Sequence, residues 1–88
     1  MKVRDLPEET RLIQLAEEAA ELSQAALKLV RAKHKETPVT ESEARRNLIE
    51  EIADVNVCIF ALVNDSDMMA VESVARQKSR RWEERLNA

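Results

Sequence analysis

The sequence predicts an all-α protein, built as one antiparallel unit of two long helices and a C-terminal helix. Glycine is absent from its 88 residues, so tight hairpin turns and glycine-rich phosphate-binding loops lose the residue that they require. Apolar residues instead recur at intervals of three and four. Residues 1–88 are expected to form a single domain, of a size that buries only about 60% of its unfolded surface and gains stability from a second subunit.

The first helix is predicted from Leu6 to Lys33. Asp5 and Glu8 form a D-x-x-E pattern, which is typical of a helix start. Pro7 is expected in the first turn, where its missing N–H has no intrahelical partner to lose. Residues at helical spacing make an apolar stripe, namely Leu12, Leu15, Ala19, Leu22, Ala26 and Leu29.

A polar segment, His34–Thr40, separates this helix from the next. Thr40 and Glu43 form a T-x-x-E capping-box pattern, which predicts a second helix from Glu41 to Val63. The run from Asn64 to Asp67 breaks that helix, and a third is predicted from Asp67 to Leu86. One stripe of the third helix carries the apolar residues Met68, Val71, Ala75, Trp82 and Leu86.

The first two predicted helices repeat one pattern. Leu15–Leu22 reads LAEEAAEL, and it aligns with Leu48–Val55, which reads LIEEIADV. Any two amphipathic helices share apolar positions, so the matching acids inside the pattern are the more informative part. The repeat predicts that both helices present acids in the same way.

A helical projection places these acids. At about 100° per residue, Glu18 and Glu51 lie within the apolar stripes, and Glu21 and Asp54 lie at the stripe edges. Each pair lies about 17–20 Å from the connecting loop. In an antiparallel hairpin the four carboxylates should therefore converge. The acids on the solvent side are Glu17 and Glu50.

Four converging carboxylates need protons or cations. Two like charges 4 Å apart repel by about 4 kcal/mol at an effective dielectric constant of 20. A ligand set of carboxylates alone favours Mg²⁺, or Mn²⁺, over zinc. The competing interpretation is ordinary surface acids on amphipathic helices, which two copies at matching positions make less attractive.

The third helix supplies basic residues. Lys78 projects onto its apolar stripe between Val71 and Trp82, and Arg81 and Arg85 flank it. These three are candidates for binding substrate phosphates. The alternatives are that Lys78 only extends its charge to solvent along the apolar surface and that Trp82 is a core anchor.

The second helix is apolar on nearly all sides, because Ile49, Phe60 and Val63 lie opposite the acids. Three helices cannot cover both of its faces, so we expect a homodimer. The net charge of −3, from 14 basic and 17 acidic residues, argues against nucleic-acid binding. No apolar run is long enough to cross a membrane, and we expect a cytoplasmic protein with Cys58 reduced.

The two acidic motifs resemble those of a known protein family. Glu17-Glu18-Ala-Ala-Glu21 and Glu50-Glu51-Ile-Ala-Asp54 resemble the E-E-x-x-E … E-x-x-D signature of MazG-like nucleoside triphosphate pyrophosphohydrolases, which belong to the all-α NTP pyrophosphatase superfamily. The resemblance covers about Leu12–Leu86. The basic third helix is similar to the family's lysine- and arginine-containing tail.

The resemblance implies a metal-dependent hydrolase. Its metal-binding and catalytic residues would be Glu18, Glu21, Glu51 and Asp54. With Mg²⁺, a nucleoside triphosphate substrate would be cleaved between the α and β phosphates, giving a nucleoside monophosphate and pyrophosphate. The family also implies homodimers or tetramers with four-helix cores. The alternative is a non-enzymatic helical dimerisation or regulatory module, which explains the apolar stripes but not the inward acids.

Overall fold

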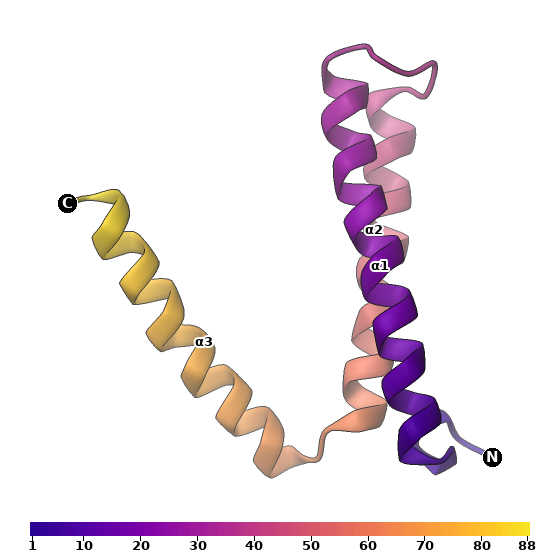
Figure 1. Ribbon diagram of the computed structural model, residues 1–88, viewed down its shortest axis with the longest axis vertical. Coiled ribbons are helices and arrows are strands. Elements are labelled where there is room, and N and C mark those ends of the chain that lie inside the picture. Colours follow the sequence, from indigo (N-terminus) through magenta and orange to yellow (C-terminus); the bar gives the residue numbers. More distant parts are fainter.

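The computed structural model describes residues 1–88 and contains helices only, in agreement with the predicted fold class. A short 3₁₀ turn, η1 (Val3–Asp5), precedes α1 (Glu8–Lys33), α2 (Glu41–Leu62) and α3 (Asp65–Leu86). The first two long helices form an antiparallel hairpin, and α3 diverges from its lower end (Figure 1). The molecule is flat, measuring 42 × 42 × 17 Å.

The hairpin is held together by a narrow seam. In α1 the residues that face α2 follow one another at alternating steps of three and four, the spacing of antiparallel helix pairs. Three of the buried residues, Leu29, Ala32 and Ala44, form a cluster that packs against Val39 and Leu48. Small side chains let the backbones approach closely, but they bury little apolar area. The complete set of buried residues is Ala25, Leu29, Ala32, Ala44, Cys58 and Ala61.

Capping fixes the starts of α2 and α3. The Thr40 hydroxyl accepts a hydrogen bond from the Glu43 backbone N–H at 3.1 Å, so α2 begins where the sequence predicts. Asn64 and Asp67 form a complete capping box at α3. Because Asn64 is the cap, α3 begins at Asp65, two residues before the predicted start.

The start of α1 differs from the sequence-based prediction. Pro7 is the N-cap and lies outside the helix, which begins at Glu8. Asp5 does not cap α1, because its carboxylate accepts the Lys2 backbone N–H at 2.8 Å within η1. The local pairing of Asp5 with Lys2 thus forms a separate turn.

This N-terminal segment closes the end of α2. Arg4 donates to the Phe60 carbonyl at 2.6 Å, and Arg11 donates to the Ala61 carbonyl at 2.8 Å. Arg11 also donates to the Leu6 carbonyl at 2.9 Å. The last carbonyls of a helix have no intrahelical donor and carry partial negative charge, so arginine donors stabilise them. The contacts hold η1 beside the C-terminal end of α2.

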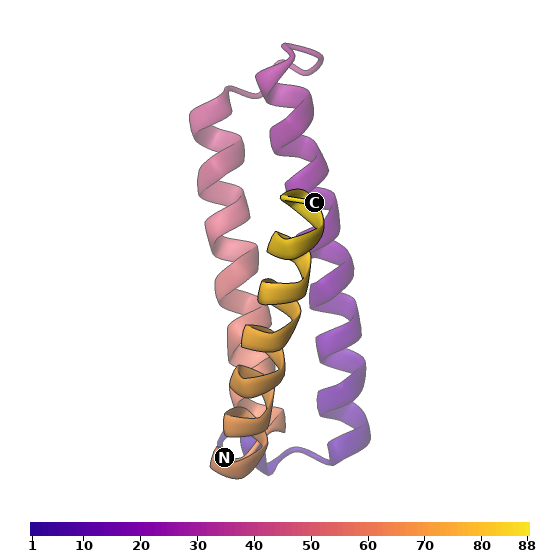
Figure 2. The same cartoon turned by 90° about the vertical axis from the view of Figure 1, so that its left-hand side faces the viewer.

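The third helix does not pack along the hairpin, in contrast to the expected three-helix antiparallel unit (Figures 1 and 2). Val63 and Asn64 are both extended and direct the chain away from α2. No residue of α3 is buried, and its apolar stripe is left open, including Val71, Trp82 and Leu86. No helix combines the length and apolar character needed to cross a membrane.

Candidate metal centre

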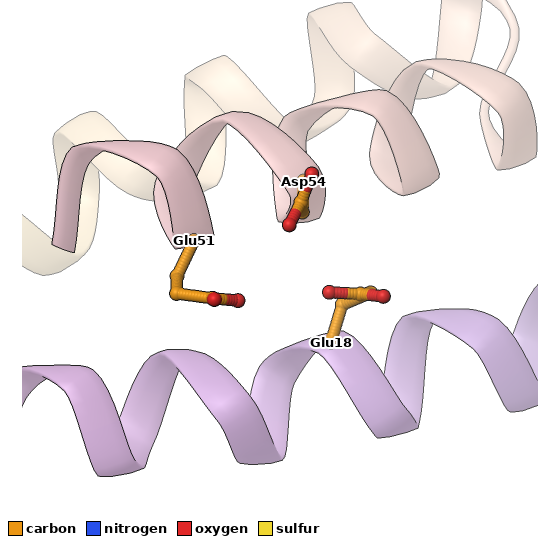
Figure 3. A group of neighbouring side chains, drawn as sticks. All are labelled: Glu18, Glu51 and Asp54. Carbon is orange, nitrogen blue, oxygen red and sulfur yellow. The ribbon is translucent and has the colours of Figure 1, made fainter. Parts of the chain in front are cut away.

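Three acids meet between α1 and α2. Glu18 extends from α1, and Glu51 and Asp54 extend from α2, with their carboxylates directed toward one another (Figure 3). One carboxylate oxygen from each lies within 4.8 Å of the other two. Glu18 and Glu51 occupy seam positions that would otherwise hold apolar side chains, so the helix register itself brings them together. We call these three residues the acidic triad.

Two oxygens of the triad lack partners. The Oε2 atoms of Glu18 and Glu51 are shielded from solvent and accept no hydrogen bond. Both side chains are half-buried, whereas Asp54 is exposed. A shielded carboxylate oxygen without a donor is destabilising, because it has lost its water and gained nothing in return. A proton or a cation would satisfy both atoms.

The electrostatics agree with this geometry. Desolvation raises the pKa of Glu18, and the nearby charges of Glu21, Asp54 and Glu51 raise it further. Desolvation also raises the pKa of Glu51, followed by the charges of Glu21 and Asp54. Glu21 is exposed and not part of the triad, but its influence on both glutamates places it at the rim. The structure therefore brings three of the four predicted acids together, and Glu21 lies near enough for its charge to act on two of them.

The triad could hold a hard cation. Its donors are all carboxylate oxygens from two rigid helices, the ligand chemistry preferred by Mg²⁺ and Mn²⁺. The neighbouring Cys58 is buried, and its pKa is raised first by desolvation and then by the charges of Glu18 and Asp54. Its burial and its raised pKa fit the interpretation of Cys58 as a small core residue.

Two grooves flank the triad along the hairpin. The first, which we call the loop-side groove, has a volume of about 390 Å³ and is lined by Glu21, Gln24, Ala25, Lys28, Arg31, Asn47 and Glu51. The second, the N-terminal groove, has a volume of about 320 Å³ and is lined by Val3, Leu6, Gln14, Glu17, Glu18, Asp54, Val57 and Cys58. Both grooves include acids of the triad in their walls.

The basic residues predicted on the third helix lie elsewhere. Lys78, Arg81 and Arg85 line one hollow on α3 together with Trp82. The structure brings these three cations together but does not bring them to the acids of the same chain, because α3 diverges (Figure 1). The cations beside the acids are Lys28 and Arg31, which the sequence analysis did not identify.

A simple signal could have identified this pair. Lys28 and Arg31 follow Glu21 by about two and three helical turns, so they extend the acidic side of α1 toward the loop. Asn47 lies one turn before Glu51 and is half-buried in the same groove.

Comparison of the chain with protein-family models, with curated proteins and with solved structures finds no match. The site therefore has to be interpreted from its own geometry.

Proposed function

We propose that this protein is a metal-dependent nucleoside triphosphate pyrophosphohydrolase. It would cleave its substrate between the α and β phosphates and release a nucleoside monophosphate and pyrophosphate. The observation that carries the proposal is the pair of shielded, unpartnered oxygens of Glu18 and Glu51, which face Asp54 across the hairpin seam. These residues belong to the doubled acidic motif that resembles the MazG-like family.

A purely structural role does not account for the acids. Glu18 and Glu51 occupy seam positions where leucine or alanine would pack without loss of solvation. Their mutual repulsion, and that of the rim acid Glu21, opposes closure of the hairpin. A bound cation reverses both effects, so the arrangement favours a metal site over a simple helix contact.

The proposed chemistry assigns a role to each acid. Glu18, Glu51 and Asp54 would hold Mg²⁺, with Mn²⁺ as a substitute. When bound, such a cation neutralises triphosphate charge and makes a nearby water easier to deprotonate. Glu21, which is exposed at the rim, would orient the attacking water and accept its proton. The new bond joins the water oxygen to the α-phosphorus, and pyrophosphate leaves.

Paired variants test the activity. A panel of nucleoside triphosphates is incubated with and without Mg²⁺, and pyrophosphate and monophosphate are measured. Glu51→Gln should abolish turnover, whereas Glu50→Gln should be nearly neutral because Glu50 is exposed and lies outside the triad. Circular dichroism confirms that both variants fold. Equal losses in the two variants, or orthophosphate as the product, would contradict the proposal.

We also propose self-association, as a homodimer or tetramer with a four-helix core. Large apolar side chains are exposed on the hairpin, among them Leu12, Leu27, Ile49 and Phe60. Exposed apolar surface of this extent is typical of an interface. Association is also the route by which Lys78, Arg81 and Arg85 could reach the acids, from the α3 of a partner chain.

The same apolar surface favours a second candidate function, a non-enzymatic helical dimerisation module. The two functions differ in their response to metal. An enzyme-like site should gain about 2.7 kcal/mol of stability at a Mg²⁺ concentration one hundred times its Kd. A module whose acids have no ligand should show no such gain and no turnover of any triphosphate.

A further inference from the structure

We propose that the substrate lies along the hairpin in one direction, with its terminal phosphates in the loop-side groove and its nucleoside in the N-terminal groove. Lys28 and Arg31 would then bind the pyrophosphate that leaves. This inference rests on the proposed function, and it adds an orientation and two phosphate-binding residues to it.

The loop-side groove carries two cations, Lys28 and Arg31, beyond the acids Glu21 and Glu51 at its triad end. Lys28 is half-buried in its wall, and Arg31 is exposed at its edge. Neither forms a salt bridge, since the ion pair in this structure joins Lys33 to Glu41. Their charges are therefore available to a ligand. Ammonium and guanidinium groups are the usual protein donors to phosphate oxygens, and the amides of Gln24 and Asn47 add neutral donors.

The N-terminal groove has a different character. Val3, Leu6 and Val57 give it an apolar lining, and Gln14 supplies one amide. It contains no basic residue, and Glu17 adds a third carboxylate to those of Glu18 and Asp54. Beside these acids, the apolar wall and the Gln14 amide suit a planar, uncharged ligand part such as a base.

The arginines near the N-terminal groove are already engaged. Arg4 and Arg11 donate hydrogen bonds to the carbonyls of Phe60 and Ala61 at the end of α2. Their role is to hold the N-terminal segment in place, so the segment contributes apolar side chains and not cations to the groove. Because free cations line only the loop-side groove, we assign the terminal phosphates to that groove and the nucleoside to the N-terminal groove.

The triad lies where the two grooves approach each other. Glu51 lines the loop-side groove, and Glu18 and Asp54 line the N-terminal groove. A ligand that occupies both grooves must therefore pass the triad. With the nucleoside on one side and the terminal phosphates on the other, the α-phosphate lies beside the triad, where the proposed cleavage takes place.

Binding of the two products separately tests this orientation. Calorimetric titrations with pyrophosphate and with a nucleoside monophosphate are made in saturating Mg²⁺, so turnover is not required. Lys28→Met and Arg31→Gln should each raise the Kd for pyrophosphate by about tenfold or more, the loss of one charge-assisted contact. The Kd for the monophosphate should change less. Gln14→Ala should show the opposite pattern.

Arg45→Gln is the matched control, because Arg45 is an exposed arginine of α2 that lines neither groove. It should leave both affinities unchanged. Wild-type pyrophosphate affinity in Lys28→Met and Arg31→Gln would overturn the inference, as would a larger effect on the monophosphate. If hydrolysis is absent but pyrophosphate binding depends on these residues, the proposed function fails and the phosphate site stands.

Discussion

Neutralising one acid of the triad should stabilise the protein when metal is absent and remove its response to metal. In Glu18→Gln, an amide of nearly the same shape replaces a carboxylate that is half-buried, unpartnered at Oε2 and repelled by three other acids. The amide is not repelled by those charges. The metal-free variant should therefore melt at a higher temperature than the metal-free wild type at neutral pH.

The direction in which stability changes with pH follows from the same acids. Because the folded-state pKa of Glu18 and Glu51 is raised, the folded protein binds protons more readily than the unfolded chain. This part of the stability is greatest below the unfolded-state pKa and is lost as the pH rises through the folded-state pKa. Glu41 acts in the opposite direction, since the Lys33 hydrogen bond lowers its pKa. The stability that Glu41 contributes is lost on acidification, to the same extent in the wild type and in Glu18→Gln.

Metal binding sets the size of the expected response. At one hundred times the Kd, a cation that binds only the folded protein adds about 2.7 kcal/mol to the free energy of unfolding. In a domain of this size, 1 kcal/mol corresponds to a shift in melting temperature of about 4–8 °C. Saturating Mg²⁺ should therefore raise the wild-type melting temperature by about 10–20 °C, and Glu18→Gln should retain only a small part of this gain.

The assay is thermal unfolding followed by circular dichroism, in chelator and in excess Mg²⁺, at several pH values. The protein concentration is fixed because association would also shift the melting temperature. Glu50→Gln removes the same charge from an exposed position outside the triad, and it should follow the wild type. The reasoning would be refuted if metal-free Glu18→Gln were less stable than the metal-free wild type. It would also be refuted if Mg²⁺ raised the melting temperatures of Glu18→Gln and the wild type equally.

Four further variants test the packing, the association and the third helix. Leu29→Ala, at a residue only 8% exposed in the buried cluster, should lower the free energy of unfolding by about 2–5 kcal/mol; Leu27→Ala, at 56% exposure, should cost much less in chemical denaturation. Phe60→Ser should shift sedimentation toward the monomer, and an unchanged distribution would remove Phe60 from the interface. Lys78→Met should lower kcat/KM by about tenfold or more if a partner's α3 binds phosphate, and an unchanged value would remove Lys78 from the site.

The helices and the convergence of the acids could be predicted from the sequence because both are local consequences of helical geometry. Thr40 defines the start of α2 by a hydrogen bond three residues along the chain. Glu18 and Glu51 meet because their positions in the repeat place them in the seam of any antiparallel hairpin with a short loop. No information beyond spacing and register was needed for either result.

The position of α3 depends on contacts that residue spacing does not encode. A helical projection shows that Lys78 lies on an apolar stripe, but it does not show which surface that stripe covers. The extended pair Val63 and Asn64 directs α3 away from the hairpin. The sequence analysis overlooked Lys28 because it lies outside the acidic motif, although it projects on the same side of α1 as Glu21.

The composition of the seam links the proposed cation site to the proposed association. Four of the six buried residues are alanines, which bury little apolar area, and two seam positions carry glutamates. The larger apolar side chains, such as Ile49 and Phe60, point outward instead. A cation between the helices and a cover over the outer face would each stabilise the hairpin. Because both would stabilise the same folded hairpin, cation binding should favour association, and association should in turn strengthen cation binding.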